Sequence, residues 1–488
     1  MLKRVISGLS ALLMMTAPLS SAQAALLAKI EADVDGSGQK RIVELTGEKK
    51  MPGSNYYSDL WILVKNADGK MLTAWKADLD GGYYCLLEKM PVNANMKKSA
   101  NITGKKDAKA EKSKADGKEN TEKRFENLLK SLEEAGQDKK NNTRNTGKPH
   151  DQILLMAAKG GKNAAVNCRI LDFSDNRQVR AVFSGADSLG VAAKAEYKPD
   201  NQFTVESALP GADGTQKPVS FSGSAKNVLR LYNADGSIAK PWLRPLVTEV
   251  ASLTTLDGRL FTEQNILAAN GQDLLGRLAV RWIHKDEKWI PEEISLKDTL
   301  DELLKADDPS QPSGAGNWRL YPRRAFIGER VISRPVVAVE EKPELQNKIN
   351  EKLNAWFAGA PEEDERAFQV KFAGPKLLSL ELGRRNKKGE VIRDLYNFNM
   401  QSGELIKLEN MFNTKNPDFV KVINLTGKPK NCFLAAKPVY WHFTGKHFIL
   451  QDRLLGEGFQ DEDAIHMTLV EKKDLLPFLK NKNILDED

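Results

Sequence analysis

Seven residues near the start of the chain constrain its fold more than any other segment. Residues 33–39, with the sequence DVDGSGQ, place oxygen-bearing side chains at every second position with glycines between them, and a strand-like run follows at 41–45. Such spacing lets a short loop fold its oxygens around a hard cation such as calcium. The pattern predicts a calcium-loop β-domain, with calcium as the candidate ion and Asp33, Asp35, Ser37 and Gln39 as its candidate ligands.

The first 24 residues have the three parts of a secretion signal. Lys3 and Arg4 form a basic start, residues 5–17 are apolar, and residues 22–24 (AQA) form a small-residue cleavage site. The apolar stretch is shorter than the ~20 residues that a spanning helix needs. We therefore expect a signal peptide over 1–24, a periplasmic or extracellular protein, and no transmembrane segment after cleavage.

The charge distribution argues against nucleic acid as a partner. The formal net charge of +7 comes mostly from the signal peptide and from residues 97–148, which hold 15 Lys/Arg and 9 Asp/Glu. The rest of the chain is close to neutral. It lacks the basic footprint that nucleic-acid-binding proteins carry.

The three cysteines, Cys85, Cys168 and Cys432, are too few for a disulfide framework. An oxidising compartment would allow one pair to form. Cys85 with Cys168 is the preferred pair, because both lie in the same predicted domain. Buried free thiols are the alternative.

Composition divides the mature chain into two predicted domains. Residues 25–295 consist of short strand patterns and turn signals such as the Asn-Ala-Asp-Gly sequences at 66–69 and 233–236. A lysine-rich insertion at 92–150 interrupts them, and its composition predicts that it is largely disordered. Residues 296–317 contain the clearest linker.

Residues 318–488 predict an α+β domain in which a helix packs on an antiparallel sheet. Pro343 starts an amphipathic helix that places Leu345, Ile349 and Leu353 on one face. Strand patterns follow between 368 and 443. The overall expectation is a mostly β domain followed by an α+β domain.

Segments in the first domain carry a family resemblance. They are the run 30–75, GGYYCLL from Gly81, DQILLM from Asp151, LYNADGSIAKPW from Leu231 and RWIHKDEKWIP from Arg281. Together they resemble secreted bacterial VCBS/FG-GAP-like repeat proteins of unassigned function, which implies an antiparallel β-domain with calcium loops. Two features depart from that family. Arg41 stands where an acidic ligand is usual, and residues 252–258 correspond to a loop that has lost nearly all of its carboxylates.

The second domain resembles a different family. VISRPVVAVEEKPELQNKINEKLNAWF from Val331 and YNFNMQSGELIKL from Tyr396 are similar to the extracytoplasmic domain shared by the anti-sigma-V factor RsiV and the peptidoglycan deacetylase PdaC. In relatives this domain accompanies lysozyme sensing or wall modification, so the resemblance implies envelope binding rather than catalysis. Residues 383–389 (GRRNKKG) replace a segment that the family commonly carries.

Catalytic motifs are sparse, and no residue is assigned a catalytic role. His442, His447 and His466 are candidates for a zinc site, with a surface histidine pair as the favoured alternative. The sequence predicts a non-enzymatic envelope protein that binds a wall glycan or protein ligand. The alternatives are an envelope hydrolase or deacetylase-like enzyme that uses the histidines, and a calcium-stabilised adhesion protein.

Overall fold

The structure is a computed structural model, and it describes most of the chain outside the two ends and the insertion. The predicted signal peptide and the insertion lie almost entirely outside the described residues, and so does most of the linker. The described ranges are 24–51, 53–79, 81–92, 149–159, 165–175, 179–210, 215–225, 231–256, 259–285, 288–297, 314–327, 330–426, 440–451 and 467–485.

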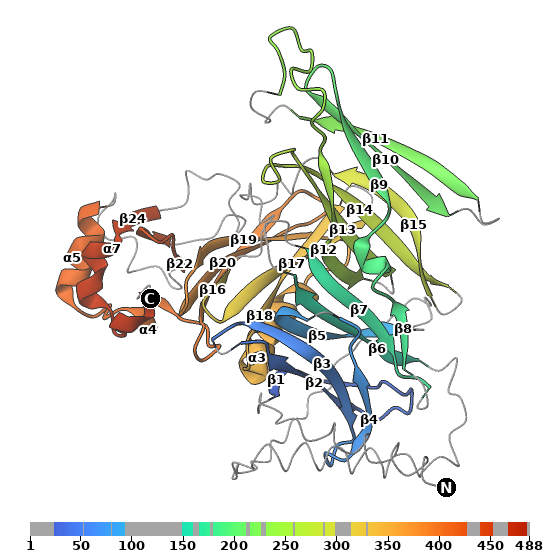
Figure 1. The fold of residues 1–488 in the computed structure, drawn as a ribbon. Helices are drawn as coiled ribbons and strands as arrows, with labels where there is room; N and C mark the ends of the chain where they lie inside the picture. Colours follow the sequence, from blue (N-terminus) through green and yellow to red (C-terminus); the bar gives the residue numbers. More distant parts are fainter. Residues whose placement is uncertain are drawn as a thin grey trace, which may run out of the picture.

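Mostly antiparallel β-sheets build the fold, which confirms the predicted mostly β class (Figure 1). The N-terminal part forms one eight-stranded sheet in which β4 pairs with β3 outside the main path. Its strands are β1 (Ala25–Ala32), β2 (Arg41–Lys49), β3 (Tyr56–Lys65), β4 (Met71–Lys76), β5 (Gly82–Val92), β6 (His150–Ala158), β7 (Val166–Asp172) and β8 (Arg180–Phe183).

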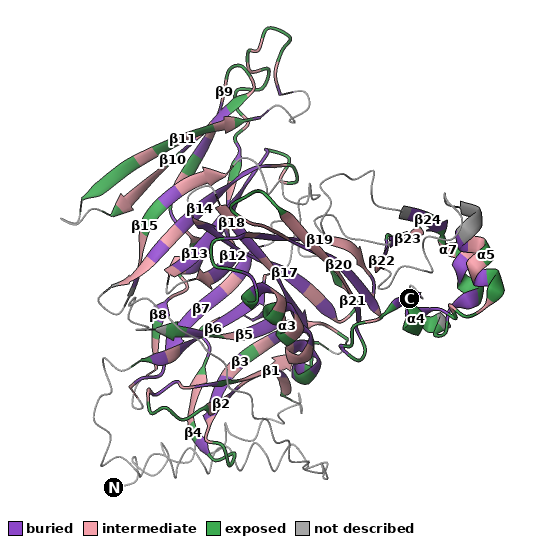
Figure 2. Cartoon of the chain, turned by 180° about the vertical axis from the view of Figure 1, so that it is seen from behind, coloured by how far each residue is buried: buried purple, intermediate pink, exposed green. Residues whose placement is uncertain are grey.

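Two further sheets complete the first half of the chain. A short 3-10 helix, η2 (Asp187–Leu189), leads to the three-stranded sheet of β9 (Ala193–Lys198), β10 (Gln202–Pro210) and β11 (Gln216–Ser224). This sheet projects from the body, and much of its surface is exposed (Figure 2). A four-stranded meander follows, made of β12 (Leu246–Leu256), β13 (Arg259–Leu267), β14 (Leu274–Lys285) and β15 (Lys288–Lys297).

The Asn-Ala-Asp-Gly turns form where the sequence predicts them. The first joins β3 to β4, with Gly69 at φ +87°, and the second closes a bridge between Tyr232 and Ile238, with Gly236 at φ +81°. These φ values lie in the left-handed region that glycine adopts at little cost.

The second half contains the predicted combination of helix and sheet. Helix α3 (Pro343–Ala358) packs on a six-stranded sheet and buries Leu345, Ile349 and Leu353, as predicted. The sheet consists of β16 (Gly314–Ala315), β17 (Trp318–Ile327), β18 (Arg330–Val339), β19 (Glu365–Ala373), β20 (Leu377–Arg385) and β21 (Val391–Asn399). The β18–β19 pairing is parallel, because α3 crosses between these strands.

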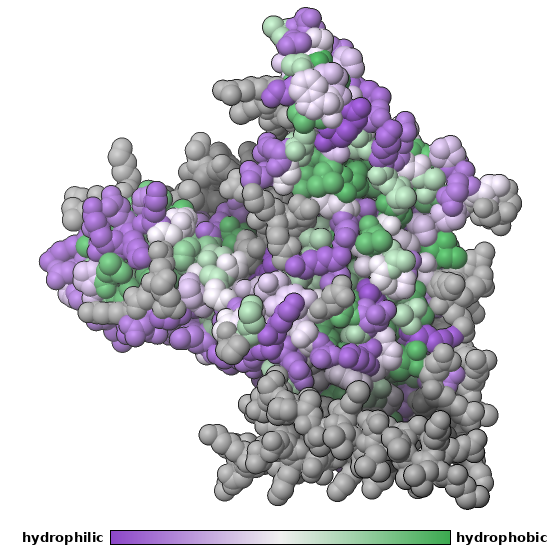
Figure 3. Space-filling view, viewed as in Figure 1, coloured by the Kyte–Doolittle hydropathy of each residue, from purple (hydrophilic) through white to green (hydrophobic). Residues whose placement is uncertain are grey.

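A small C-terminal unit extends from this sheet and has its own aromatic core around Phe412, Phe419, Trp441, Phe443 and Phe448. Its surface is largely hydrophilic (Figure 3). The elements are α4 (Leu408–Met411), α5 (Pro417–Thr426), β22 (Tyr440–Phe443), β23 (His447–Gln451), β24 (Met467–Glu471), α7 (Lys472–Leu475), η4 (Leu476–Phe478) and η5 (Lys482–Leu485). Among the described helices, none combines the length and apolar character needed to cross a membrane.

The preferred disulfide is absent, and its absence follows from strand geometry. Cys85 and Cys168 are both buried free thiols. Cys85 packs into the core on one face of the eight-stranded sheet, whereas Cys168 packs into the core on the other face. Successive side chains of a strand point to opposite faces, so the backbone of the sheet separates the two sulfurs. Cys432 lies outside the described residues.

One core joins the two predicted domains. The largest hydrophobic cluster contains residues of the eight-stranded sheet, the projecting sheet and the four-stranded meander. Tyr321, Val336 and Ala338 on β17 and β18 belong to the same cluster. The helix-bearing sheet therefore shares its apolar interior with the domain that precedes it in the sequence.

Candidate anion-binding cavity

A cavity of about 220 Å³ lies where the meander, the helix-bearing sheet and the last turn of α3 meet. Its polar lining residues are Thr254, Thr255, Arg323, Arg334, Asn354 and Arg366, and its apolar ones are Leu256, Ala325, Ile332, Phe357 and Ala358. Three of the lining side chains are guanidinium groups. None of the described residues that line the cavity is acidic.

Strand pairing brings the arginines together. Arg323 on β17 is the direct antiparallel partner of Arg334 on β18, so both side chains leave the same face of the sheet. Ile332, two residues before Arg334, pairs in parallel with Arg366 on β19. The three arginines therefore come from three adjacent strands.

Arg323 is completely buried and holds three parts of the molecule together. Its Nη2 donates to Glu88 Oε2 on β5 at 3.0 Å, and its Nη1 contacts the Leu253 carbonyl on β12 and the Met156 sulfur on β6. Its Nε is also buried and has no hydrogen-bond partner among the described residues. Burial lowers the pKa of Arg323 from its ordinary value, but a guanidinium remains protonated under any ordinary condition.

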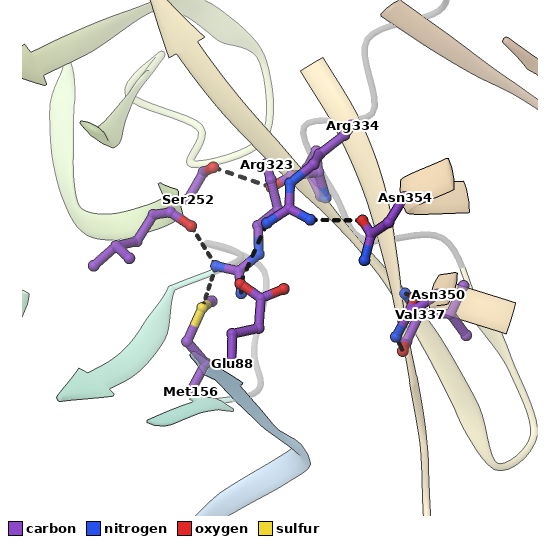
Figure 4. Close-up of polar contacts among 10 residues, drawn as sticks. Glu88, Met156, Ser252, Arg323, Arg334, Val337, Asn350 and Asn354 are labelled. Atoms are coloured by element: carbon purple, nitrogen blue, oxygen red, sulfur yellow. Dashed lines mark hydrogen bonds and ion pairs between the residues drawn. The ribbon is translucent and has the colours of Figure 1, made fainter. Parts of the chain in front are cut away.

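Arg334 is the more accessible member of the pair, with a side chain that is 24% exposed. Its Nη1 donates to Asn354 Oδ1 on α3 at 2.8 Å, and its Nη2 lies 3.4 Å from Glu88 Oε2. Figure 4 shows Arg323 and Arg334 converging on Glu88, with Asn354 on the opposite side of Arg334.

Arg366 donates hydrogen bonds to backbone carbonyls at and just beyond the C-terminal end of α3. Its Nη1 donates to the Phe357 carbonyl at 3.1 Å, and its Nη2 reaches the Ala360 and Pro361 carbonyls. The last carbonyls of a helix lack intrahelical donors and carry the negative end of its dipole. Arg366 therefore fixes the wall of the cavity that α3 provides.

Among the described residues, positive charge exceeds negative charge around the cavity. Glu88 is the carboxylate that contacts Arg323 and Arg334, and its side chain is 20% exposed. Burial alone would raise the pKa of Glu88, but the charges of the two arginines outweigh it and hold this pKa below its ordinary value. Glu88 is thus ionised, and it offsets one of the two guanidinium charges. The arrangement can accept an additional anionic group.

The predicted calcium loop is closed by its own hydrogen bonds. Asp33 Oδ1 accepts from the backbone of Ser37 at 3.1 Å, and Asp33 Oδ2 accepts from Gly38 at 2.9 Å. Gly36 and Gly38 take φ values of +64° and +80°, which allow the backbone to curl around the carboxylate. In this arrangement the Asp33 oxygens face the loop backbone.

Arg41 occupies Asp35 and Gln39, two of the other predicted ligands of this loop, while the Ser37 hydroxyl accepts from the Gln39 backbone at 3.2 Å. Its Nη2 donates to Asp35 Oδ2 at 2.8 Å, and its Nη1 donates to Gln39 Oε1 at 3.1 Å. Burial raises the pKa of Asp35, but bonds from Ser37 and Arg41 outweigh it, so this pKa is below its ordinary value. A guanidinium within hydrogen-bond distance opposes a cation, so these residues as arranged do not fit calcium. Calcium binding here stays a prediction that requires Arg41 to move away.

His442 and His447 are not direct cross-strand partners. His442 on β22 pairs with Ile449 on β23, and His447 lies two residues before Ile449 on that strand, which makes the two histidines diagonal neighbours on one face of the sheet. Burial, with a contribution from the Lys371 ammonium, lowers the pKa of His442 to about 4. His466 lies outside the described residues, and no group of three or more His, Cys, Asp or Glu side chains in the described part of the chain is arranged to hold a metal ion.

Sequence reasoning missed the arginine cavity. Arg323 and Glu88 are 235 residues apart in the chain, so no local motif contains both. The available signal was charge inside strand patterns, at Arg323 and Arg324 in one strand and Arg334 in the next. The segment 252–258 was interpreted as a depleted calcium loop; its residues 252–256 belong to strand β12, and Thr254 and Thr255 line the cavity.

Comparisons with known proteins assign no family. No family model matches the chain, and no curated protein matches it. Two solved structures illustrate the level of similarity. A rhamnogalacturonan lyase of Bacillus licheniformis is 11% identical, with a TM-score of 0.23, and the match covers 78% of this chain and 50% of the lyase. An α-L-arabinanase of Penicillium chrysogenum, complexed with arabinobiose, is 10% identical with a TM-score of 0.22, covering 93% of this chain and 95% of that chain. This chain thus spans half the length of the lyase, and similarities at this level carry no argument.

Proposed function

We propose that the protein is a non-enzymatic envelope protein that binds a wall glycan through an anionic group of that glycan. The observation that carries this proposal is the excess of guanidinium over carboxylate groups around the cavity. Arg323 and Arg334 share a single carboxylate, and the described lining residues add no acid. An anion that entered would neutralise charge in a partly desolvated place, where electrostatic attraction is stronger than in water.

The chemistry of the lining residues favours binding over catalysis. Guanidinium groups keep their protons, so they donate hydrogen bonds to an anion and do not act as acids or bases. Their planar fork matches the two oxygens of a carboxylate. Thr254 and Thr255 bring hydroxyl groups to the same cavity, which suit the hydroxyl groups of a sugar.

The sequence supports an envelope location. The basic and apolar start of residues 1–24 has the pattern of a secretion signal. An FG-GAP/VCBS-like β-domain followed by an RsiV-like α+β domain is the architecture that the two resemblances imply. Both resemblances are to proteins that work outside the cytoplasm, where a wall polymer would be the natural partner. The proposal therefore places the mature chain in the periplasm or outside the cell.

A sedimentation assay with insoluble peptidoglycan tests this function. The mature chain is mixed with native peptidoglycan, and with the same material after its carboxylates have been converted to amides. We expect the wild-type protein to sediment with the native polymer and to stay in solution with the amidated one. Arg334→Gln should sediment less than wild type. The matched control is Arg244→Gln, which removes an exposed arginine that does not line the cavity.

Two results would overturn the proposal. One is wild-type protein that stays in solution with native peptidoglycan, which would leave a protein ligand as the better interpretation. The other is equal sedimentation of Arg334→Gln and Arg244→Gln, which would place the binding surface elsewhere.

A further inference from the structure

The cavity already has a carboxylate on its arginine pair, and that carboxylate belongs to the protein. Glu88 comes from β5 in the N-terminal sheet, whereas Arg323 and Arg334 come from β17 and β18 in the helix-bearing sheet. Glu88 Oε2 accepts from both guanidinium groups. The arginine pair is therefore shaped to hold a carboxylate, and Glu88 occupies the position that a ligand would need.

The two links to Glu88 are unequal. The bond from Arg323 measures 3.0 Å and involves a side chain with no exposed surface. The contact from Arg334 measures 3.4 Å, and this side chain is 24% exposed. Ion pairs on the surface contribute little, whereas breaking a buried one is costly. Arg334 is therefore the guanidinium that can change partners while Arg323 keeps Glu88.

A second contact prepares Arg334 for such an exchange. Asn354 Oδ1 accepts from Arg334 Nη1 at 2.8 Å and fixes the plane of the guanidinium from the helix side. Asn354 is exposed, and both residues line the cavity. A ligand would thus meet an oriented donor, which reduces the entropy lost on binding.

We propose that the ligand group is a single sugar carboxylate, such as that of a uronic acid, and that Glu88 is a built-in competitor for Arg334. This inference rests on the proposed function and specifies its ligand and its regulation. The cavity of about 220 Å³ is smaller than ordinary ligand pockets, which run from roughly 300 Å³ upward. It therefore admits one acidic sugar group and not a long segment of polymer.

The competition couples ligand binding to the contact between two sheets. When the ligand takes Arg334, the link from β18 to Glu88 on β5 is released, and the β17 link remains. Coupling of this kind is reciprocal: the factor by which the Arg334–Glu88 contact weakens ligand binding equals the factor by which the ligand weakens that contact. Removing the negative charge of Glu88 is the direct way to test that relationship.

Titration calorimetry with glucuronate, and with uncharged glucuronamide as the control ligand, tests the inference on the mature chain. Glu88→Gln removes the competing charge and keeps an oxygen acceptor for Arg323, so we expect it to bind glucuronate at least about fivefold more tightly than wild type. Asn354→Asp places a second carboxylate beside Arg334 at an exposed position, and we expect it to bind at least about fivefold more weakly. Ala355→Asp adds the same charge to the next exposed residue of α3 and should bind like wild type.

The outcomes separate the two proposals. Glucuronate that fails to bind wild type, or binds no better than glucuronamide, would overturn this inference, whereas the proposed function is decided by the sedimentation of wild type with native peptidoglycan. Wild-type binding that is unchanged in Glu88→Gln and in Asn354→Asp would overturn the competition alone. If circular dichroism shows that Glu88→Gln does not fold, Asn354→Asp decides the question. Weaker glucuronate binding by Asn354→Asp than by wild type supports the competition. Glucuronate binding as tight as that of wild type and Ala355→Asp rejects it.

Discussion

Arg323 and Arg334 stand directly opposite each other on adjacent antiparallel strands. Like charges in this position ordinarily destabilise a sheet. Here the carboxylate of Glu88 bridges them, and the protein thereby retains two guanidinium groups at the edge of a cavity. An apolar pair at these two positions would not carry this cost in stability. We therefore connect the arginine pair with binding.

Removal of the bridging carboxylate should destabilise the protein strongly. Glu88→Ala leaves Arg323 buried without its ion-pair partner, and such losses cost about 3 kcal/mol of unfolding free energy. Urea unfolding followed by tryptophan fluorescence would measure it. Glu31→Ala is the control, because Glu31 is 65% exposed and 3.9 Å from Lys40, and it should change stability by less than about 0.5 kcal/mol. Equal effects of the two substitutions would contradict the structural role of Glu88.

Removal of Arg41 should increase the response of the first loop to calcium. Arg41→Gln takes the guanidinium away from Asp35 and Gln39, so oxygens become available to a cation. We expect millimolar calcium to raise the melting temperature of Arg41→Gln more than that of wild type, because a ligand that binds only the native state stabilises it. The additional substitution Asp33→Ala should remove the difference. The idea fails if calcium shifts wild type and Arg41→Gln equally.

Glu340 should make the protein less stable as pH rises from about 4.5 to about 8. Burial, assisted by the neighbouring Glu341, raises the pKa of Glu340 to about 8 from an ordinary value of 4.5, despite the opposing charge of Lys49. Between these values the native state holds a proton that the unfolded chain has lost, so stability falls with rising pH.

Glu340→Gln removes this titration. Urea unfolding should show that Glu340→Gln stabilises the native state more at about pH 9 than at about pH 5. Glu351→Gln, at an exposed position of α3, serves as the control and should have the same small effect at both values. If Glu340→Gln changed the unfolding free energy equally at both pH values, the Glu340 carboxyl would be shown to ionise normally.

The thiols of Cys85 and Cys168 should be unreactive until the protein unfolds. Both are buried, and burial raises the pKa of each to about 12, so the reactive thiolate is scarce at neutral pH. A Cys432→Ser variant isolates these two residues. We expect a disulfide-exchange reagent to detect neither thiol in the native protein and both in denaturant. A failure to detect them even in denaturant would show that they are oxidised.

Local patterns in the sequence were sufficient for much of the fold. Helix α3 follows from Pro343 and the apolar spacing behind it, and the glycine turns at Gly69 and Gly236 mark hairpins because their backbone conformation is local. Helix α5 was missed, although Pro417 at its start and Phe419 and Ile423 on one face fit a helical pattern.

Features that depend on which sheet faces meet could not be predicted. The disulfide between Cys85 and Cys168 was predicted because both residues lie in one predicted domain. Whether it can form depends instead on the face of the sheet to which each side chain points, and the two point to opposite faces. The cavity depends on Arg323, Arg334 and Glu88, which are brought together by packing between sheets. The loop residues Asp35 and Arg41 are close in sequence, yet their bond depends on the direction of side chains at the start of β2.

The shared core has a consequence for how this chain could be divided. Tyr321, Val336 and Ala338 would face water if the helix-bearing half were produced alone, and their partners in the other half would be exposed as well. A protease cut between residues 297 and 314 should therefore yield two fragments that co-purify. Recombination that replaced one half with an unrelated domain would leave the apolar surface of the other half exposed and prone to aggregation. The two halves are therefore expected to be inherited together.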